Sequence, residues 1–277
     1  MKTPKLLSAS VVALAMCAGA VQASPVVTQW MAVDLSTFDP STVLPGGNTA
    51  PNPVLSAGNT QLHWGVAASA AGQSGLVIAN YGPTVVNTGV LTPTVQITHE
   101  NNPIFAPSLT SVDILATLLL FSTAPTAGPN AFGQITFKVR FIETPNDPLS
   151  GTCADGTARI GGPLNSNGCA DIFVINSPPT DFVLSYDSDG AINGNDPRDY
   201  NVSFSGTGFG LLSNGACAAA GAAAGCRGFR TAENADTTGV FSVLINVVPE
   251  PGSLALLGLG LTGVALSRRR QSKQADK

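Results

Sequence analysis

The chain has 277 residues, of which 44% are hydrophobic, 11% charged and 6% aromatic, with 30 glycines and 20 prolines. This composition excludes a typical disordered chain, which combines few apolar residues with a high net charge. Residues 24–248 hold six basic and fifteen acidic side chains, a net charge of −9, and this acidic balance argues against a nucleic-acid partner.

Residues 1–23 have the three parts of a secretory signal peptide, which we expect to form a helix before its removal. Lys2 and Lys5 supply the positive charge, an apolar run covers residues 6–20, and Val21-Gln22-Ala23 is a small-x-small cleavage site. The sequence therefore predicts export of a mature chain that begins at Ser24.

Residues 24–248 alternate short apolar runs with turns rich in Gly, Pro, Asn and Ser, and this pattern predicts one strand after another. Residues 34–60 are predicted as a loop, and residues 111–122 suit either a doubly buried strand or a short core helix, of which we choose the strand. No helical period persists for three turns. We expect an all-β fold, a single antiparallel β-sandwich or jelly-roll-like domain over residues 24–248. Its expected strands are 26–33, 61–66, 75–79, 84–90, 94–99, 111–122, 132–144, 171–175, 180–186, 200–205 and 240–248.

The mature chain holds four cysteines, Cys153, Cys169, Cys217 and Cys226, an even number that indicates disulfides in an exported protein. Three pairings are possible. We favour Cys153–Cys169 and Cys217–Cys226, because each closes a local loop. The alternative is a four-cysteine metal site, which the absence of a Cys-x2-Cys pair disfavours. The Ala-rich run 216–225 is predicted as a disulfide-closed loop, since its glycines weaken a helix.

Few residues point to chemistry. His99 ends a predicted strand, where its ring nitrogens would bond backbone or Asn101 as a strand-end latch. A metal site with Glu100 or His63, or a role as catalytic base, are the alternatives. No nucleophile, metalloprotease or phosphate-binding motif occurs, so we predict no catalytic residue and no enzyme. A triad or a carboxylate pair assembled in space stays open.

A second candidate site lies in the run 187–196, where acidic and amide side chains surround glycines. Calcium takes oxygen ligands, and such a turn can wrap them, although the Glu at position twelve of an EF-hand is missing. A plain hairpin loop would use the same residue types. The calcium candidates are Asp187, Asp189, Asn193, Asn195 and Asp196, and no other cofactor is predicted.

The end of the chain has three parts: Pro249-Glu250-Pro251, an uncharged segment at 253–267 and the basic cluster Arg268-Arg269-Arg270. The apolar segment is short for a permanent span, which needs about 20 residues. The arginines should stay in the cytoplasm together with residues 271–277. We expect a hydrophobic helix that inserts transiently in the inner membrane, the alternative being a plain membrane anchor.

This tail resembles the PEP-CTERM sorting signal of Gram-negative bacteria that make an extracellular polysaccharide matrix. The resemblance covers residues 248–270 and keeps Pro249, Glu250, Pro251, Arg268, Arg269 and Arg270 in order. It implies that an exosortase recognises the signal (residues 249–270) and removes the tail near the Pro-Glu-Pro motif, much as a GPI signal is removed. The chain would then pass from an inner-membrane intermediate to the cell surface or the extracellular matrix.

The tetrapeptide Thr98-His99-Glu100-Asn101 is similar to the signature of a subgroup called THxN family PEP-CTERM proteins, whose motif residues here are Thr98, His99 and Asn101. Trp64-Gly65 upstream and the run 169–174 downstream fit the same subgroup. The resemblance implies an exported, surface-associated protein of no defined activity.

These features together predict a structural or adhesive component of a biofilm or exopolysaccharide layer. The first alternative is a carbohydrate-binding module, calcium-assisted or not, and a secreted hydrolase comes after it. The aromatic platforms of a carbohydrate-binding module would come from Trp30, Trp64, Tyr81, Tyr186 and Tyr200.

Overall fold

The structure, a computed structural model, describes residues 24–46, 53–122, 131–144, 151–176, 181–189, 197–249 and 259–260. The predicted signal peptide and nearly all of the C-terminal tail lie outside these residues. Within them the elements are strands, apart from a short helix, α1 (Asn214–Ala219), and two 3-10 turns, η1 (Pro40–Thr42) and η2 (Ala57–Asn59). An all-β fold is thereby confirmed, whereas its finer description as a sandwich or jelly roll stays a prediction.

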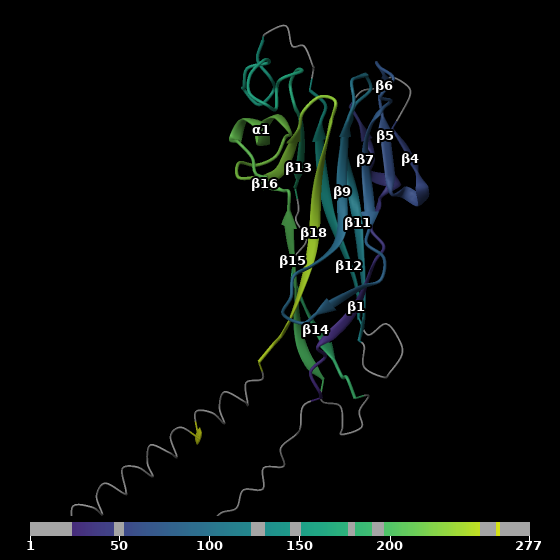
Figure 1. Ribbon diagram of the computed structural model, residues 1–277, viewed down its shortest axis with the longest axis vertical. Coiled ribbons are helices and arrows are strands. Elements are labelled where there is room, and N and C mark those ends of the chain that lie inside the picture. Colours follow the sequence, from purple (N-terminus) through teal and green to yellow (C-terminus); the bar gives the residue numbers. More distant parts are fainter. Residues whose placement is uncertain are drawn as a thin grey trace, which may run out of the picture.

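Two large sheets, both wholly antiparallel, make up the body of the molecule (Figure 1). In the first sheet the order is β16-β17-β13-β12-β11-β1-β8, with β2 and β3 also paired to β11. Its strands are β1 (Gln29–Asp34), β2 (Thr37–Phe38), β3 (Leu44–Pro45), β8 (Thr84–Asn87), β11 (Leu109–Ser122), β12 (Ala131–Ile142), β13 (Asp171–Ile175), β16 (Gly210–Leu211) and β17 (Arg227–Thr231).

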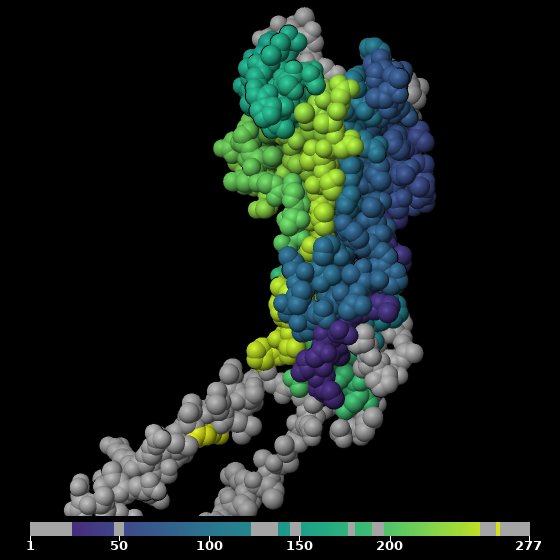
Figure 2. Space-filling view, viewed as in Figure 1, coloured from purple at the N-terminus to yellow at the C-terminus, as the bar shows by residue number. Residues whose placement is uncertain are grey.

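The second sheet has the order β14-β15-β18-β9-β7-β5-β4, and β15, β18 and β9 lie side by side on the face shown in Figure 2. A separate two-stranded sheet pairs β6 (Val66–Ala67) with β10 (Ile104–Phe105). The strands of the second sheet are β4 (Val54–Ser56), β5 (Gln61–Trp64), β7 (Ser74–Asn80), β9 (Thr92–Asn101), β14 (Phe182–Tyr186), β15 (Arg198–Thr207) and β18 (Ala235–Val247).

The two sheets share hydrophobic cores, because their strands alternate buried and exposed side chains and turn the buried ones toward each other. One core gathers Trp64 and Ile97 of the second sheet with Phe141 and Phe173 of the first. The other core forms around Trp30, whose ring meets Tyr186 and Tyr200 edge-on at centroid distances of 5.4 and 5.0 Å.

Both ends of the described body lie together at the lower end of Figure 1. Nε of Arg198 donates a hydrogen bond to the carbonyl of Ser24, and the amide of Val248 donates to the carbonyl of Asp199. From there β18 runs for 13 residues to the opposite end, a distance of roughly 40 Å at 3.3 Å per residue. The chain therefore enters and leaves at one end, and the start of β18 marks the other.

The strands of the structure can be compared with those predicted from the sequence. The strand predicted at 171–175 is β13 with the same bounds, and the apolar run 111–122 is a strand, as chosen. The loop predicted at 34–60 was wrong in part, because three strands form there. β2 and β3 pair with the distant β11, and β4 pairs with β5, which follows it in the chain.

The loop predicted at 216–225 was also wrong in part, because its first residues belong to α1. Ser213 caps this helix by accepting a hydrogen bond from the amide of Ala216 at 3.1 Å, and alanine favours the helical state. Gly221, with a φ of 66°, follows the helix in the left-handed conformation that commonly ends one.

Candidate functional site

Two acidic side chains come together where neighbouring strands of the first sheet meet. The pairing of β12 with β13 puts Ile142 opposite Ile172, so Glu143 and Asp171 stand opposite each other one step further along. Asp171 is fully buried and Glu143 is half-buried. Antiparallel pairing thus places two carboxyl groups side by side that are 28 residues apart in the chain.

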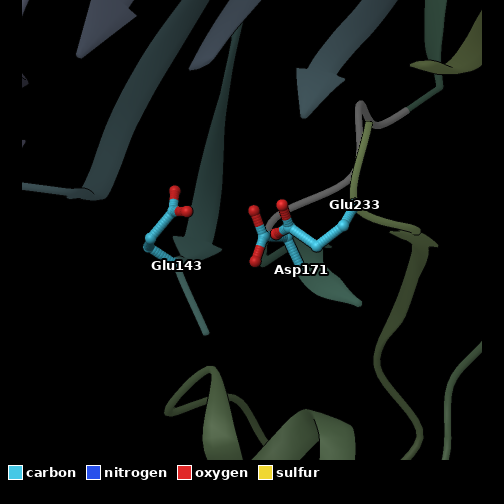
Figure 3. Close-up of side chains that lie close together, drawn as sticks. All are labelled: Glu143, Asp171 and Glu233. Atoms are coloured by element: carbon cyan, nitrogen blue, oxygen red, sulfur yellow. The ribbon is translucent and has the colours of Figure 1, made fainter. Parts of the chain in front are cut away.

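A third carboxyl group reaches the same place from the connection between the sheets. Glu233 lies between β17 of the first sheet and β18 of the second, next to Asn234, whose φ of 58° turns the chain. Its side chain is 3% exposed. One oxygen from each of Glu143, Asp171 and Glu233 lies within 4.8 Å of the others. Figure 3 shows the three side chains close together. We call these three residues the acidic cluster.

Neutral donors surround the acidic cluster. The indole Nε1 of Trp64 donates to Oε2 of Glu143 at 3.0 Å. The amide and the hydroxyl of Thr144 donate to Oδ1 of Asp171 at 3.0 and 2.9 Å. Among the residues that the structure describes, no Lys or Arg pairs with any of the three carboxyl groups. Ionisation of the cluster is therefore not offset by a salt bridge to any described residue.

Burial controls the protonation of this cluster. It raises the pKa of Glu143 to about 7, against the effect of the hydrogen bond from Trp64. It raises the pKa of Asp171 well above the usual range, and the charge of Glu143 adds to this increase. It also raises the pKa of Glu233 to about 7, opposed by the side chain of Asn101. A low-dielectric surrounding without a cation favours the neutral acid in each case.

The tetrapeptide that the sequence singled out ends beside this cluster. Asn101, fully buried, is the last residue of β9, and its Nδ2 donates to the carbonyl of Thr231 at 3.0 Å, two residues before Glu233. Thr98 faces the other side of the sheet, where its hydroxyl lies 3.0 Å from that of Thr238. The structure thus brings one residue of the predicted motif, Asn101, to the acidic cluster.

His99 takes a different role from the one predicted. Its ring is fully buried, and neither ring nitrogen has a hydrogen-bond partner among the described residues, so the expected strand-end latch was wrong. The ring instead packs among aromatic side chains, stacked on Trp64 at 6.0 Å and edge-on to Phe141 at 4.7 Å. Burial lowers the pKa of His99 to about 3, so at neutral pH it is an uncharged core residue.

The alternative of a metal site formed by His99 with its neighbours also fails, because the other two residues face away. Nε2 of His63 lies 3.6 Å from Oε2 of Glu100, and both side chains are partly exposed. Successive residues of a strand point to opposite faces, which separates Glu100 from His99.

The predicted calcium run is described only in part. The amide of Asp189 donates to Oδ1 of Asp187 at 3.2 Å, an arrangement that any tight turn can have. Asn193, Asn195 and Asp196 lie outside the described residues, so this expectation stays a prediction.

The predicted sugar platforms are mostly inside the molecule. Trp30, Trp64 and Tyr200 are fully buried, Tyr186 is nearly so, and among these five aromatic residues Tyr81 alone is exposed, at 39%. A flat exposed ring is what stacks against a sugar. The aromatic residues therefore serve the cores.

A cavity of about 530 Å³ lies elsewhere, between β15, β18 and the run 222–226. Its described lining is mainly apolar, with rings from Phe204, Phe209 and Phe241. The charged side chain in this described lining is Arg227, whose Nη2 donates to the carbonyl of Phe209. It gathers no pair of groups for acid–base chemistry, so the acidic cluster is the better candidate site.

The cysteines pair as the sequence favoured, Cys153 with Cys169 and Cys217 with Cys226. The first pair closes the connection from β12 to β13 and ends two residues before Asp171. Arg230 reaches this connection, where Nη2 lies 3.0 Å from a carboxylate oxygen of Asp155 and from Oδ1 of Asn165. The disulfide and these contacts hold the segment that leads into the acidic cluster.

Sequence reasoning missed all three members of the acidic cluster as site residues. Asp171 had a usable signal, because it stands alone before the apolar run of β13. Glu143 and Glu233 had none, since only the pairing of β12 with β13 and the crossing from β17 to β18 bring them together.

Residues 247–270 match the PEP-CTERM protein-sorting motif. This motif is a substrate signal for exosortase and implies a secreted or cell-surface protein. A comparison with curated proteins finds no match. Among the described residues no helix has both the length and the apolar character needed to cross a membrane, and segment 253–267 lies almost wholly outside them.

Proposed function

We propose that this chain is an exported structural or adhesive component of a biofilm or exopolysaccharide layer, released from its membrane intermediate by exosortase. The THxN subgroup remains part of this proposal. The observation that supports it most is the way in which the sorting motif follows the last strand. Backbone pairing of β18 ends at Val247, Val248 makes one further hydrogen bond, and Pro249 is exposed.

In this arrangement the Pro-Glu-Pro motif lies after the described strands. Every strand that the structure describes ends before Pro249, so cleavage at or beyond the Pro-Glu-Pro motif leaves the pairing of these strands intact. While the tail is still held in the membrane, the end that carries Ser24 and Val248 is nearest to it. The opposite end, with the start of β18, then projects outward by roughly 40 Å.

The other two candidate functions receive less support. A carbohydrate-binding module needs exposed aromatic rings, and the tryptophans of this chain are both fully buried. A secreted hydrolase needs carboxyl groups that a polymer can reach, whereas Asp171 and Glu233 are 0% and 3% exposed. A structural role needs neither feature, and two disulfides suit a protein that must persist outside the cell.

The test compares the protein recovered from its own host with that from a strain lacking exosortase. We expect the first to end near Pro249, by intact mass and C-terminal peptide, and the second to retain residues 251–277. A variant with Arg268, Arg269 and Arg270 changed to Gln is the matched control, and it should retain the tail in both strains. Deletion of the whole chain should weaken the cohesion of the biofilm under shear.

Two results would count against this proposal, each against a different part of it. An intact tail in both strains would mean an ordinary membrane anchor and no processing. Unchanged cohesion of the biofilm after deletion, with processing as expected, would reject the structural role while leaving the export route in place.

A further inference from the structure

The acidic cluster poses a problem of charge. Three carboxyl groups from Glu143, Asp171 and Glu233 lie within 4.8 Å of one another, two of them almost inaccessible to water. Ionised groups at this spacing repel one another strongly, and burial removes the water that would screen them. Proteins resolve such an arrangement by protonation or by binding a cation.

The spacing fits one shared cation. Calcium binds oxygen at about 2.3–2.6 Å, so two ligands on opposite sides of one ion are at most about 5 Å apart. The oxygens of the acidic cluster satisfy this limit for all three pairs. They also come from three separate segments, β12, β13 and the β17–β18 connection, so an ion there would tie the two sheets together.

A neutral side chain supplies an independent sign of a ligand. Asn101 is fully buried, its Nδ2 donates to the carbonyl of Thr231, and its Oδ1 has no hydrogen-bond partner among the described residues. Oδ2 of Asp171 and both carboxylate oxygens of Glu233 are also buried without a hydrogen-bond partner among the described residues. A buried amide oxygen without a partner is costly, and amide oxygens are regular calcium ligands.

We infer that Glu143, Asp171 and Glu233, together with Oδ1 of Asn101, bind a divalent cation that prefers oxygen ligands, and that calcium is this ion. The candidate ligands are all oxygens, and the ring nitrogens of His99 do not belong to the group that could share one ion. Zinc and copper favour nitrogen or sulfur. Magnesium demands a near-octahedral site and retains water, which a site with two buried carboxylates suits less well.

The cation would act as a structural clamp at the outward end of the molecule. It would replace the repulsion among three carboxylates by attraction to one ion, and it would fix the β17–β18 connection against β9, β12 and β13. This role does not depend on the proposed matrix function, because it concerns the stability of the body itself.

The first experiment measures thermal unfolding of the exported protein purified from its host, near pH 7, with EDTA and with about 1 mM calcium. A site that is about 100-fold saturated should raise the melting temperature by roughly 5–10 °C. Glu233→Gln keeps the size of the side chain and removes a charge. We expect this variant to lose the calcium response and, in EDTA, to melt above the wild type, because repulsion in the cluster is relieved.

A second readout does not depend on stability. Terbium is a probe for calcium sites, and Trp64 donates a hydrogen bond to Glu143, so excitation of tryptophan should sensitise emission from bound terbium. Calcium should displace the probe, and Glu233→Gln should reduce the emission at least tenfold. Glu100→Gln, on the outer face of β9, is the matched control and should retain both responses.

Three results would overturn the inference. The first is a melting temperature of the wild type that does not change with calcium. The second is a calcium response of Glu233→Gln equal to that of the wild type. The third is a response that disappears in Asp189→Asn while Glu233→Gln retains it. The last result would place the ion in the run 187–196. A calcium response lost with Glu233→Gln and kept with Glu100→Gln supports the site as described.

Discussion

The indole N–H of Trp64, on β5 of the second sheet, donates a hydrogen bond of 3.0 Å to Oε2 of Glu143, which follows β12 in the first sheet. The same indole stacks on His99 and lies 4.8 Å from the ring of Phe141, so it belongs to the core and to the acidic cluster at once. Packing and polar chemistry therefore depend on each other at this end of the molecule.

Trp64→Phe should test this link. The change keeps an aromatic ring in the core and removes the N–H donor from the half-buried Glu143. We expect a loss of about 2–4 kcal/mol in the free energy of unfolding, from a smaller ring and a lost hydrogen bond to a carboxylate. Urea unfolding near neutral pH measures this loss.

Trp30→Phe is the matched control for that experiment. Trp30 is also fully buried and aromatic-packed, but its Nε1 has no hydrogen-bond partner among the residues described by the structure. Its change to Phe should therefore remove packing alone and cost less. Equal losses for the two variants would mean that the Trp64–Glu143 hydrogen bond contributes little.

The pKa of Glu233 predicts how stability changes with pH. Burial raises this pKa from 4.5 to about 7, so between these values the folded chain retains a proton that the unfolded chain has lost. The contribution of Glu233 to the free energy of unfolding is therefore present below pH 4.5. It falls by roughly 3 kcal/mol as pH rises from about 4.5 to 7. Glu143 and Asp171, which face Glu233 from the first sheet, act in the same direction, and Asn101 opposes them.

The measurement is urea unfolding in EDTA across this pH range for the wild type and Glu233→Gln. Gln cannot ionise, so the stability of the variant relative to the wild type should rise with pH by that amount. The comparison uses the difference between the two proteins, because Asp34, whose pKa burial raises to about 6, contributes equally to both. A difference that stays constant with pH would show that Glu233 titrates normally.

His99 has the opposite pH dependence. Burial lowers its pKa from 6.5 to about 3, so the folded chain keeps the ring neutral while the unfolded chain takes up a proton. The contribution of His99 to the free energy of unfolding is present above pH 6.5. It falls by up to about 5 kcal/mol as pH falls toward 3.

His99→Leu should remove this loss. The variant has a side chain of similar volume and no nitrogen without a hydrogen-bond partner, so near pH 7 its stability should lie within about 1 kcal/mol of the wild type or above it. At pH 4 it should be clearly the more stable protein, as followed by thermal unfolding. His63→Gln, on the outer face, is the control that retains His99 and the acid sensitivity. If His99→Leu remained as acid-sensitive as the wild type, the buried ring would not be the cause.

Gly228 and Gly210 face each other across β17 and β16 and form a matched pair. A Cβ on Gly228 would lie 1.8 Å from the carbonyl oxygen of Phe173, a backbone atom of β13, whereas a Cβ on Gly210 meets no atom within 4 Å. We expect Gly228→Ala to cost more than about 3 kcal/mol and Gly210→Ala less than about 1 kcal/mol. Urea unfolding and the yield of soluble protein report both, and similar values would mean that β17 can shift without cost.

The sequence by itself determined the fold class, most of the strands and the sorting tail. Each of these depends on a local pattern that neighbouring residues carry by themselves. Examples are the alternation of apolar residues in β9 and the order of the three short segments after Val248. The pairing of Cys153 with Cys169 was favoured for the same reason, since the loop is local.

Only the tertiary structure decided which polar residues meet. Glu143, Asp171 and Glu233 are separated by 28 and 62 residues, and nothing in the local sequence links one to another. Strand pairing and the crossing from β17 to β18 bring them together, and burial then changes their chemistry. His99 shows the same limit. Alternation placed it correctly on the buried face of β9, but its aromatic surroundings come from β5, β12 and β17 and leave its nitrogens without a partner among the described residues. Long-range pairing sets both environments, and no local pattern encodes it.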